Sequence, residues 1–140
     1  MNKPTVLFAT DFSDNAELAM TQARTYAKMA SAGILLVHVL EVPSPKEGEG
    51  MLHHGTHEDA SESVERRLKE IAASIDDIDC EYQLLKGDPA DEILRVAEEA
   101  GATVVVIGTK GRSGVARLLL GSVAEQVVRK APCSVLVVKQ

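Results

Sequence analysis

The sequence contains no tryptophan, and aromatic residues make up only 3% of it. A platform of aromatic side chains that stacks the bases of single-stranded nucleic acid is therefore not expected. Basic side chains are also in the minority, since 15 Lys and Arg face 21 Asp and Glu, for a formal net charge of −6. A negative chain repels a phosphate backbone, so we expect no nucleic-acid partner.

Cysteines are scarce too, with only Cys80 and Cys133 in the chain. They are too few and too far apart for a disulfide framework or a zinc site, and we interpret both as buried thiols within or beside strands. No segment has the ~20 apolar residues that a membrane-spanning helix needs. The first residues lack the basic, apolar and small-residue order of a secretory signal, so we expect a cytoplasmic protein without a membrane partner.

The sequence is instead rich in small and branched aliphatic residues. Hydrophobic residues fill 45% of its 140 positions, which suits one domain over residues 1–140 that buries roughly two-thirds of its unfolded surface. Runs rich in Val, Leu and Ile predict strands at residues 5–9, 34–40, 80–86, 103–107 and 134–139. Helical patterns between them cover residues 14–32, 58–75, 88–101 and a last stretch that ends near residue 130.

Several helix ends carry recognisable signals. Gly33 is expected to cap the first helix at its C-terminus, and Asp88-Pro89 to begin the third with an N-cap and a first-turn proline. Small residues also form a stripe along the first helix, which permits close packing on a sheet. The stripe consists of Ala16, Ala19, Ala23, Ala27 and Ala30.

Residues 41–57 are polar and are expected to form a loop that is too long for a simple connector. This segment contains His53, His54 and His57, which would share one face only if it were helical. Gly55 argues against a helix there, so we favour a polar loop over a metal site.

Strands that alternate with helices predict right-handed crossovers and a mostly parallel sheet covered by helices on both faces. Two strand orders fit this pattern, 3-2-1-4-5 and the flavodoxin-like 2-1-3-4-5. In the first order the winding reverses between the first and fourth strands, and ligands of such sheets bind beyond the strand ends at the reversal. That order brings Thr10 and Asp11 close to Gly108.

A glycine-rich segment follows the fourth expected strand and precedes a helix. It reads Gly108-Thr109-Lys110-Gly111 and, after nine further residues, Gly121-Ser122. Glycines let backbone N–H groups approach an anion, and a helix N-terminus adds a favourable dipole. Because Lys110, Arg112 and Arg117 add positive charge to this strand-loop-helix segment, it predicts a phosphate site.

Each of these residues also has a purely structural interpretation. The glycines could serve only a tight turn, and the three cations could be ordinary surface charges. Ser122 could be the N-cap of the last helix, a role compatible with phosphate binding. Asp11 could cap the first helix through Asp11-Phe12-Ser13-Asp14, or its carboxylate could accept hydrogen bonds from ribose hydroxyls, and the sequence alone leaves both open.

Over essentially its whole length the chain resembles the universal stress proteins. The similarity rests on five segments, Ala9-Thr10-Asp11, Val37-His38-Val39, the loop at 107–112, Gly121-Ser122-Val123, and the closing strand at 133–138. The spacing Gly-x2-Gly-x9-Gly-Ser looks like that of the ATP-binding branch. The resemblance implies a Rossmann-like α/β fold, a five-stranded parallel sheet of order 3-2-1-4-5 with helices on both faces. It also implies a homodimer through the last strand and bound ATP, with Mg²⁺ or Mn²⁺.

The resemblance further implies roles for individual residues. Asp11 would hold the ribose or adenine end, and the backbone of Val39 would meet the adenine edge. Glycines Gly108 and Gly111 would line the ribose and phosphate path. The β- and γ-phosphates would be contacted by Gly121, Ser122 and Val123, and the expected nucleotide-binding set is completed by Thr10, Lys110 and Arg112.

Two positions depart from the family's ATP-binding pattern. Ala9 stands where many such members have proline, and Ala124 stands where some offer a hydroxyl. The second departure predicts that one phosphate contact is missing.

The leading functional interpretation is an ATP-binding stress-response protein with weak or no hydrolysis, whose nucleotide state an unknown protein partner reads. No convincing general base for water is evident in the sequence. An adenylate-forming enzyme that cleaves ATP is an alternative, although Asp11-Phe12-Ser13-Asp14 replaces the Ser-Gly-Gly-type loop of such enzymes. A structural dimer that binds no nucleotide is a third possibility, and a flavin-binding electron carrier is disfavoured.

Overall fold

Five parallel strands form a single sheet in the order β3-β2-β1-β4-β5 in the computed structural model, which describes residues 3–41, 54–109 and 120–139. The strands are β1 (Thr5–Ala9), β2 (Gly33–Leu40), β3 (Cys80–Lys86), β4 (Val104–Gly108) and β5 (Ser134–Val138). This order is one of the two that the sequence left open, and the one that the family resemblance implies. The expected strand boundaries are correct to within one residue at each end.

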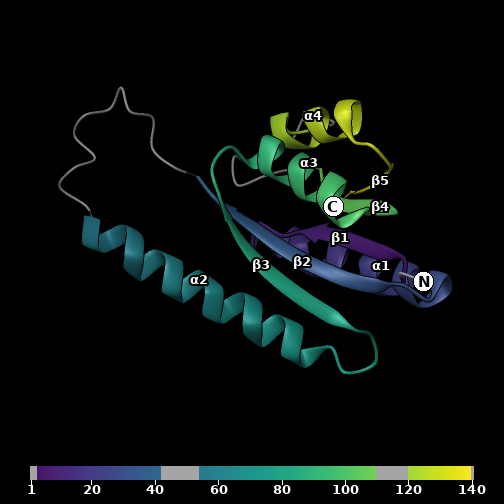
Figure 1. Ribbon diagram of the computed structural model, residues 1–140, viewed down its shortest axis with the longest axis horizontal. Helices are drawn as coiled ribbons and strands as arrows, with labels where there is room; N and C mark the ends of the chain where they lie inside the picture. Colours follow the sequence, from purple (N-terminus) through teal and green to yellow (C-terminus); the bar gives the residue numbers. More distant parts are fainter. Residues whose placement is uncertain (1–2, 42–53, 110–119, 140) are drawn as a thin grey trace.

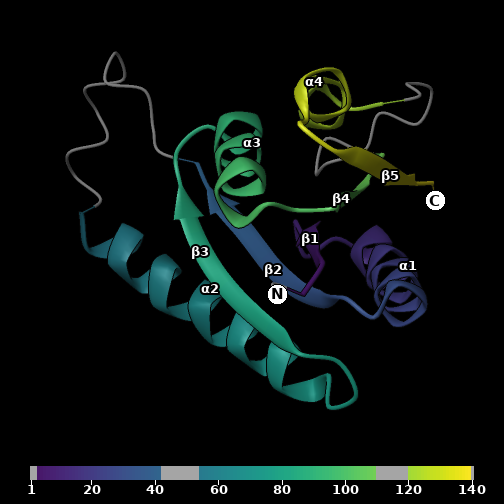
Figure 2. The ribbon, with the colours of Figure 1, turned by 45° about the vertical axis from the view of Figure 1, so that its right-hand side comes forward.

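Four helices cover the sheet, α1 (Asp14–Ala30), α2 (His54–Ser74), α3 (Pro89–Ala100) and α4 (Ser122–Lys130). Helices α1 and α2 pack on one face, and α3 and α4 on the other (Figures 1 and 2). The chain first winds from β1 to β2 and β3, then returns to β4 and β5. Because each crossover is right-handed, this reversal moves the later helices to the opposite face.

The core has two layers, one on each side of the sheet. On the α1 and α2 side, Val6 and Phe8 pack with Leu68 of α2. On the α3 and α4 side, Leu7 and Val105 pack with Val127 of α4. The central strands are therefore buried on both faces, as near-continuous aliphatic runs require.

The expected alanine stripe on α1 is confirmed. Ala19, Ala23 and Ala27 are all buried in the core against the sheet, and Ala23 has no exposed surface. The expected C-cap, however, was wrong. The left-handed residue is Ser31, at φ 53°, and its N–H donates to the Ala27 carbonyl, whereas Gly33 already begins β2.

The ends of α3 agree with the sequence signals. A carboxylate oxygen of Asp88 accepts a hydrogen bond from the Asp91 N–H at 3.0 Å, and Pro89 occupies the first turn. Gly101 terminates the helix at φ 62°, a conformation that glycine adopts without the strain that other residues incur.

The polar loop predicted at residues 41–57 is too long at its C-terminal end. The structure places residues 54–57 in α2, in spite of Gly55. A glycine inside a helix costs only about 1 kcal/mol, and helix propagation adds hydrogen bonds without a new nucleation step. The packed face around Leu68 anchors the helix. The prediction that Gly55 prevents a helix did not take this tertiary packing into account.

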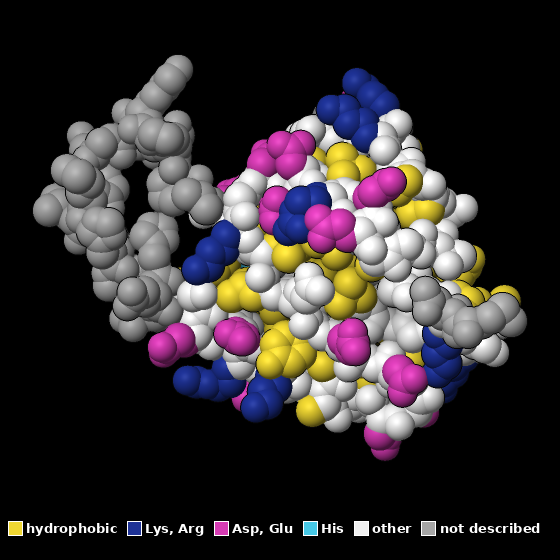
Figure 3. Space-filling model, viewed as in Figure 1, with side chains coloured by type: hydrophobic (Ala, Val, Ile, Leu, Met, Phe, Trp, Pro, Cys, Tyr) yellow, Lys and Arg dark blue, Asp and Glu magenta, His cyan; other side chains and the backbone are white. Residues whose placement is uncertain are grey.

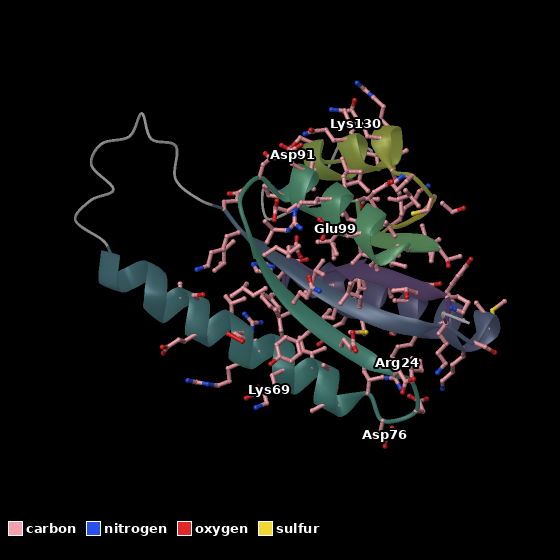
Figure 4. The ribbon with its side chains drawn as sticks, in the orientation of Figure 1. Arg24, Lys69, Asp76, Asp91, Glu99 and Lys130 are labelled. Carbon is pink, nitrogen blue, oxygen red and sulfur yellow. The ribbon has the colours of Figure 1, made fainter. Side chains whose placement is uncertain are left out.

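Ion pairs fix the turn between α2 and β3 against α1. Arg24 reaches this turn (Figure 4), where its Nη2 is 3.3 Å from Asp77 Oδ1, and Lys28 Nζ is 2.6 Å from Asp77 Oδ2. The hydrogen bond from Lys28 holds the pKa of the Asp77 carboxyl below its ordinary value. Since these groups are exposed, the pairs position the turn more than they stabilise the fold.

Charged side chains of both signs are interspersed among the described residues on the face in Figure 3. The expectation of no nucleic-acid partner stays a prediction. Among the described residues, no helix is both long enough and apolar enough to cross a membrane.

Close packing of α1 can be tested at the centre of its alanine stripe. Ala23→Leu is expected to lower the free energy of unfolding by about 1–3 kcal/mol, because the larger side chain has no room against the sheet. Urea denaturation followed by circular dichroism measures the change. Gln22→Leu places the same side chain on the exposed face of α1 and should change stability by less than about 0.5 kcal/mol. Similar losses in both variants would contradict the packing described here.

Candidate functional site

A cleft of about 730 Å³ lies at the carboxyl ends of β1, β2 and β4 and extends to the N-terminus of α4. Open α/β sheets bind their ligands at this position, where the winding reverses. Seven of the residues singled out in the sequence line the cleft, namely Thr10, Asp11, Val39, Gly108, Gly121, Ser122 and Val123. The other three, Lys110, Gly111 and Arg112, lie outside the described residues.

The turn after β1 is held from three directions. The Thr10 N–H donates to the Val37 carbonyl of β2 at 2.9 Å, and the Thr10 carbonyl lies 2.6 Å from His38 Nδ1. Because a carbonyl oxygen only accepts hydrogen bonds, Nδ1 carries the proton. The Thr10 hydroxyl oxygen accepts from the Phe12 N–H at 3.1 Å, which closes the turn on itself.

The position of Asp11 excludes one of its two interpretations, that of a cap of the first helix. The N-cap of α1 is Ser13, so Asp11 lies two residues before the N-cap and does not cap the helix. Its Oδ1 accepts a hydrogen bond from the Ser13 N–H at 2.9 Å, a local Asx turn. Oδ2 has no hydrogen-bond partner in the part of the chain that the structure describes, and the half-buried side chain lines the cleft.

Between Asp11 and Ser13, the backbone of Phe12 is in the left-handed region at φ 62°. A bulky residue there costs about 1–3 kcal/mol and persists only where surrounding contacts hold it. Such contacts are present, since the Phe12 ring lies 4.6 Å from the His38 ring between centroids. Phe12 also contacts Arg67 of α2, whose guanidinium carbon lies 4.1 Å from the centroid of the Phe12 ring.

The backbone of Val39 is available at the end of β2. The Val37 carbonyl points toward β1, where it meets Thr10, and the Leu40 carbonyl points toward β3, where it accepts from the Gly87 N–H at 2.9 Å. Since backbone direction alternates along a strand, the N–H and C=O of Val39 point to the β1 side, beyond the last interstrand bond. No described residue pairs with them. This donor–acceptor pair at the cleft is suited to the edge of a planar ligand.

The first turn of α4 supplies free amides. The N-cap is Gly121, not Ser122 as the sequence suggested, and Ser122 is the first helical residue. The Gly121 N–H donates to the Thr109 carbonyl at 2.6 Å and is therefore already used. The next three amides, of Ser122, Val123 and Ala124, precede the first intrahelical bond and have no partner among the described residues.

The side chain of Ala124 is 3% exposed and packs in the core layer below α4. A hydroxyl at this position would need space in that layer. The hydroxyl–phosphate contact predicted to be missing at position 124 is therefore disfavoured by packing as well as by the residue type.

His38 and Thr109 received no role in the sequence analysis, although both line the cleft. His38 is 8% exposed and supports the turn at Thr10, and Thr109 is 5% exposed and binds both Val138 and Gly121 through its backbone. The signal that could have found them is a polar residue at the carboxyl end of an apolar run. A buried polar group needs a partner, so such a residue marks where a strand contacts something specific.

No group of three or more metal-ligating side chains occurs within the described residues. The structure also gives no activated nucleophile at either cysteine. Burial raises the pKa of the Cys80 thiol to about 11, with the charge of Glu81 contributing, and burial also raises the pKa of Cys133. Both thiols are half-buried, which agrees in part with the buried thiols expected from the sequence.

A parallel sheet wound in both directions, with a cleft at the reversal, defines the Rossmann-like class of α/β domains. The sequence matches the universal stress protein family over residues 3–139. The chain therefore belongs to the universal stress protein family, and the resemblance inferred from its motifs is confirmed.

Two curated relatives are similar over most of their length. Universal stress protein MJ0531 of Methanocaldococcus jannaschii is 34% identical over 139 residues, which cover 96% of this chain and 81% of the relative. A Thermus aquaticus universal stress protein, named for its position in the 3′ region of a QAH/OAS sulfhydrylase, is 34% identical over 142 residues, covering 96% and 98%.

Solved structures share the fold over nearly the whole chain. The Methanocaldococcus jannaschii protein MJ0577 superposes with a TM-score of 0.77 at 29% identity, covering 100% of this chain and 98% of that one. A universal stress protein of Archaeoglobus fulgidus in complex with dAMP gives a TM-score of 0.66 at 26% identity. Another universal stress protein structure, in complex with cAMP, gives 0.70 at 25%. Each of these two covers 99% of this chain and 98% of its own.

The shielding of Cys80 has a measurable consequence. At pH 8 its alkylation by iodoacetamide in the folded protein is expected to be at least about ten-fold slower than in the unfolded chain, where a thiol titrates near 8.5. The rate should rise as the pH approaches 11, because the thiolate fraction grows. Peptide mass spectrometry after timed quenching separates Cys80 from Cys133. Equal rates in folded and urea-unfolded protein would contradict the shielding.

Proposed function

We propose that this universal stress protein binds ATP in the cleft and acts as a regulatory protein, with weak or no hydrolysis, whose nucleotide state a protein partner reads. The observation that supports this most strongly is the first turn of α4, where three consecutive amides without partners line a cleft at the winding reversal. Such amides, with the helix dipole behind them, favour a phosphate group. The nucleotide complexes of two solved relatives support the same ligand class.

Each end of the nucleotide has suitable chemistry in the proposal. The carboxylate of Asp11 would accept hydrogen bonds from ribose hydroxyls, and the backbone of Val39 would pair with the adenine edge. The phosphates would lie at the amides of Ser122 and Val123. Thr10, Gly108 and Gly121 would shape the walls, with Gly121 acting through its bond to Thr109. Lys110, Gly111 and Arg112 are assigned to the phosphates from the sequence.

The proposal includes Mg²⁺ or Mn²⁺ bound with the ATP. These ions need few protein ligands beside nucleotide phosphates, commonly one or two carboxylates together with water. The carboxylates that line the cleft are Asp11 and Glu41, so the donor set is compatible with a phosphate-bound ion. When bound, the ion would neutralise phosphate charge.

The described residues that line the cleft offer little for hydrolysis. A general base must lie within hydrogen-bond reach of the attacking water. Among the described residues that line the cleft, the titratable side chains are Asp11, His38 and Glu41. Asp11 is engaged in its turn, and the His38 ring is fixed by its bond to Thr10, so the proposal assigns neither to water activation.

One measurement separates this function from its alternatives. The purified protein is denatured, and any released nucleotide is identified by mass, followed by titration with ATP. Bound ATP without turnover supports the proposal, whereas turnover to AMP supports an adenylate-forming enzyme. A protein that contains no nucleotide and does not bind ATP at millimolar concentration would be a structural dimer.

The cytoplasmic location expected from the sequence stays a prediction.

We also propose a homodimer in which β5 pairs with the same strand of a second copy. β5 is an edge strand of the sheet, and an unpaired edge favours addition of another strand. The Thr109 N–H donates to the Val138 carbonyl at 3.1 Å, so the backbone of Val138 faces β4. By alternation, the N–H and C=O groups of Val135 and Val137 face the free edge.

The phosphate site is tested by removing a single amide. Ser122→Pro eliminates one N–H at the first helical position, where proline is well tolerated, and Gly121 before it has the extended backbone (φ −71°, ψ 167°) that a following proline requires. The dissociation constant for ATP, measured by calorimetry, should rise about ten-fold or more, because hydrogen bonds to charged groups are strong.

The matched control is Ser122→Ala, which removes the hydroxyl and keeps the amide. It should bind ATP more tightly than Ser122→Pro, and both variants should unfold at nearly the denaturant midpoint of the parent. If Ser122→Pro binds ATP as tightly as the parent, the amides of α4 do not hold the phosphates.

The dimer is tested by removing an edge-facing amide. Val137→Pro deletes an N–H that points away from β4, so the fold is expected to persist while strand pairing between copies is lost. Sedimentation velocity should report a monomer. Val137→Thr keeps the N–H and should remain dimeric, and a Val137→Pro variant that also remains dimeric would exclude pairing through β5.

A further inference from the structure

Three side chains from separate elements stack beside the nucleotide cleft. The Phe12 ring, in the turn after β1, lies 4.6 Å from the His38 ring of β2 with an interplanar angle of 34°. Arg67 of α2 places its guanidinium carbon 4.1 Å from the centroid of the Phe12 ring. The stack therefore joins α2, the β1–α1 turn and the end of β2.

The middle member of the stack controls the turn that carries Asp11. Phe12 follows Asp11 directly, and its backbone is left-handed at φ 62°, a conformation that a bulky side chain adopts only under constraint. The turn's internal hydrogen bonds, from Phe12 to Thr10 and from Ser13 to Asp11, are made with Phe12 in this conformation. Whatever holds the Phe12 ring thus also holds the Asp11 carboxylate.

Arg67 is outside the nucleotide cleft. It lines an adjoining groove of about 580 Å³ between α1 and α2, together with Phe12 and Met20, and this groove shares Thr10 and Ser13 with the cleft. Two acidic residues, Glu17 and Glu70, line the same groove, yet none of the ion pairs among the described residues includes Arg67. Its contact is the face of the Phe12 ring, the geometry of a cation–π interaction.

We propose that Arg67 is a positioning residue for nucleotide binding, which acts through Phe12 to hold Asp11 in place for the ribose. This inference rests on the proposed ATP-binding function and extends it to a residue of α2 that does not line the cleft. Because His38 is next to Val39 in β2, the same stack fixes the adenine and ribose contacts relative to each other. The inference predicts an effect on the nucleoside end and none on the phosphate end.

The experiment compares ligands as well as variants in the full-length protein. Arg67→Met keeps the aliphatic stem and removes the charge, Arg67→Lys keeps a cation, and Arg66→Met removes an exposed neighbouring charge as the matched control. Dissociation constants are measured for ATP, adenosine and inorganic tripolyphosphate. Arg67→Met should weaken ATP and adenosine by about two- to five-fold in parallel, with tripolyphosphate unchanged. Arg67→Lys should restore most of the affinity, and Arg66→Met should match the parent.

A second comparison identifies the route of the effect. Phe12→Leu removes the ring, so adding Arg67→Met to it should weaken ATP binding no further. If Arg67→Met lowers the free energy of unfolding but leaves ATP and adenosine affinities at parental values, Arg67 has only a structural role and the inference is wrong. Equal weakening of all three ligands would also overturn it, since that pattern indicates long-range charge. A parent protein that binds neither ATP nor adenosine would instead refute the proposed function, and the inference with it.

Discussion

The cleft at the carboxyl ends of the strands depends on one constraint, the handedness of the crossover connections. Each crossover must be right-handed, so the change of winding direction after β3 sends α3 and α4 to the face opposite α1 and α2. The chain therefore leaves β1 and β4 toward opposite faces, and the cleft lies at the ends of these two strands. The cleft is a consequence of this topology, and the side chains around it only adapt it to a ligand.

The same topology explains why backbone groups there have no partners. The backbone groups of the central strands pair with neighbouring strands, but β2 continues past the last bond to β1, which leaves Val39 without a partner on that side among the described residues. A helix cannot satisfy its own first amides, so α4 leaves those of Ser122 and Val123 open. These groups line the cleft, where water, or in the proposed function a nucleotide, satisfies their hydrogen bonds.

Much of this arrangement was predictable because it is encoded locally. Aliphatic runs separated by helical patterns gave the strands, and the capping signals at Asp88 and Gly101 gave the ends of α3. The strand order was not decided by these patterns, because both orders satisfy the same right-handed crossovers, and it was the family resemblance that pointed to the observed one. The left-handed cap at Ser31 was also missed because local signals did not decide it. The nearby Gly33 is the stronger local signal for a helix end, but packing of α1 determines where the helix ends.

The site was predictable in its position but not in its internal support. Residues 10–11 and 121–123 follow an apolar run or precede a helix in a recognisable local pattern, and in the proposed function this pattern is the one that a nucleotide requires. The contacts among Phe12, His38 and Arg67 join residues that are 26 or more positions apart, and no local pattern reports them. The bond between Thr109 and Gly121 likewise depends on how α4 returns to the end of β4. Sequence motifs record what faces the ligand, and tertiary contacts determine how firmly it is held.

In the proposed function, the chemistry of the cleft favours retention of a nucleotide over its turnover. Backbone amides at a helix N-terminus stabilise a phosphate by fixed partial charge, and they do so for the bound substrate as much as for a transition state. Binding both states equally lowers the dissociation constant without accelerating the chemical step. Acceleration would require a group aimed at the attacking water or at the charge that develops on transfer. At the described ends of β1 and β2, Asp11 Oδ1 is bonded to Ser13 and His38 to Thr10. In the proposed function, such a site would retain its nucleotide without turning it over, which is the property that a regulatory role requires.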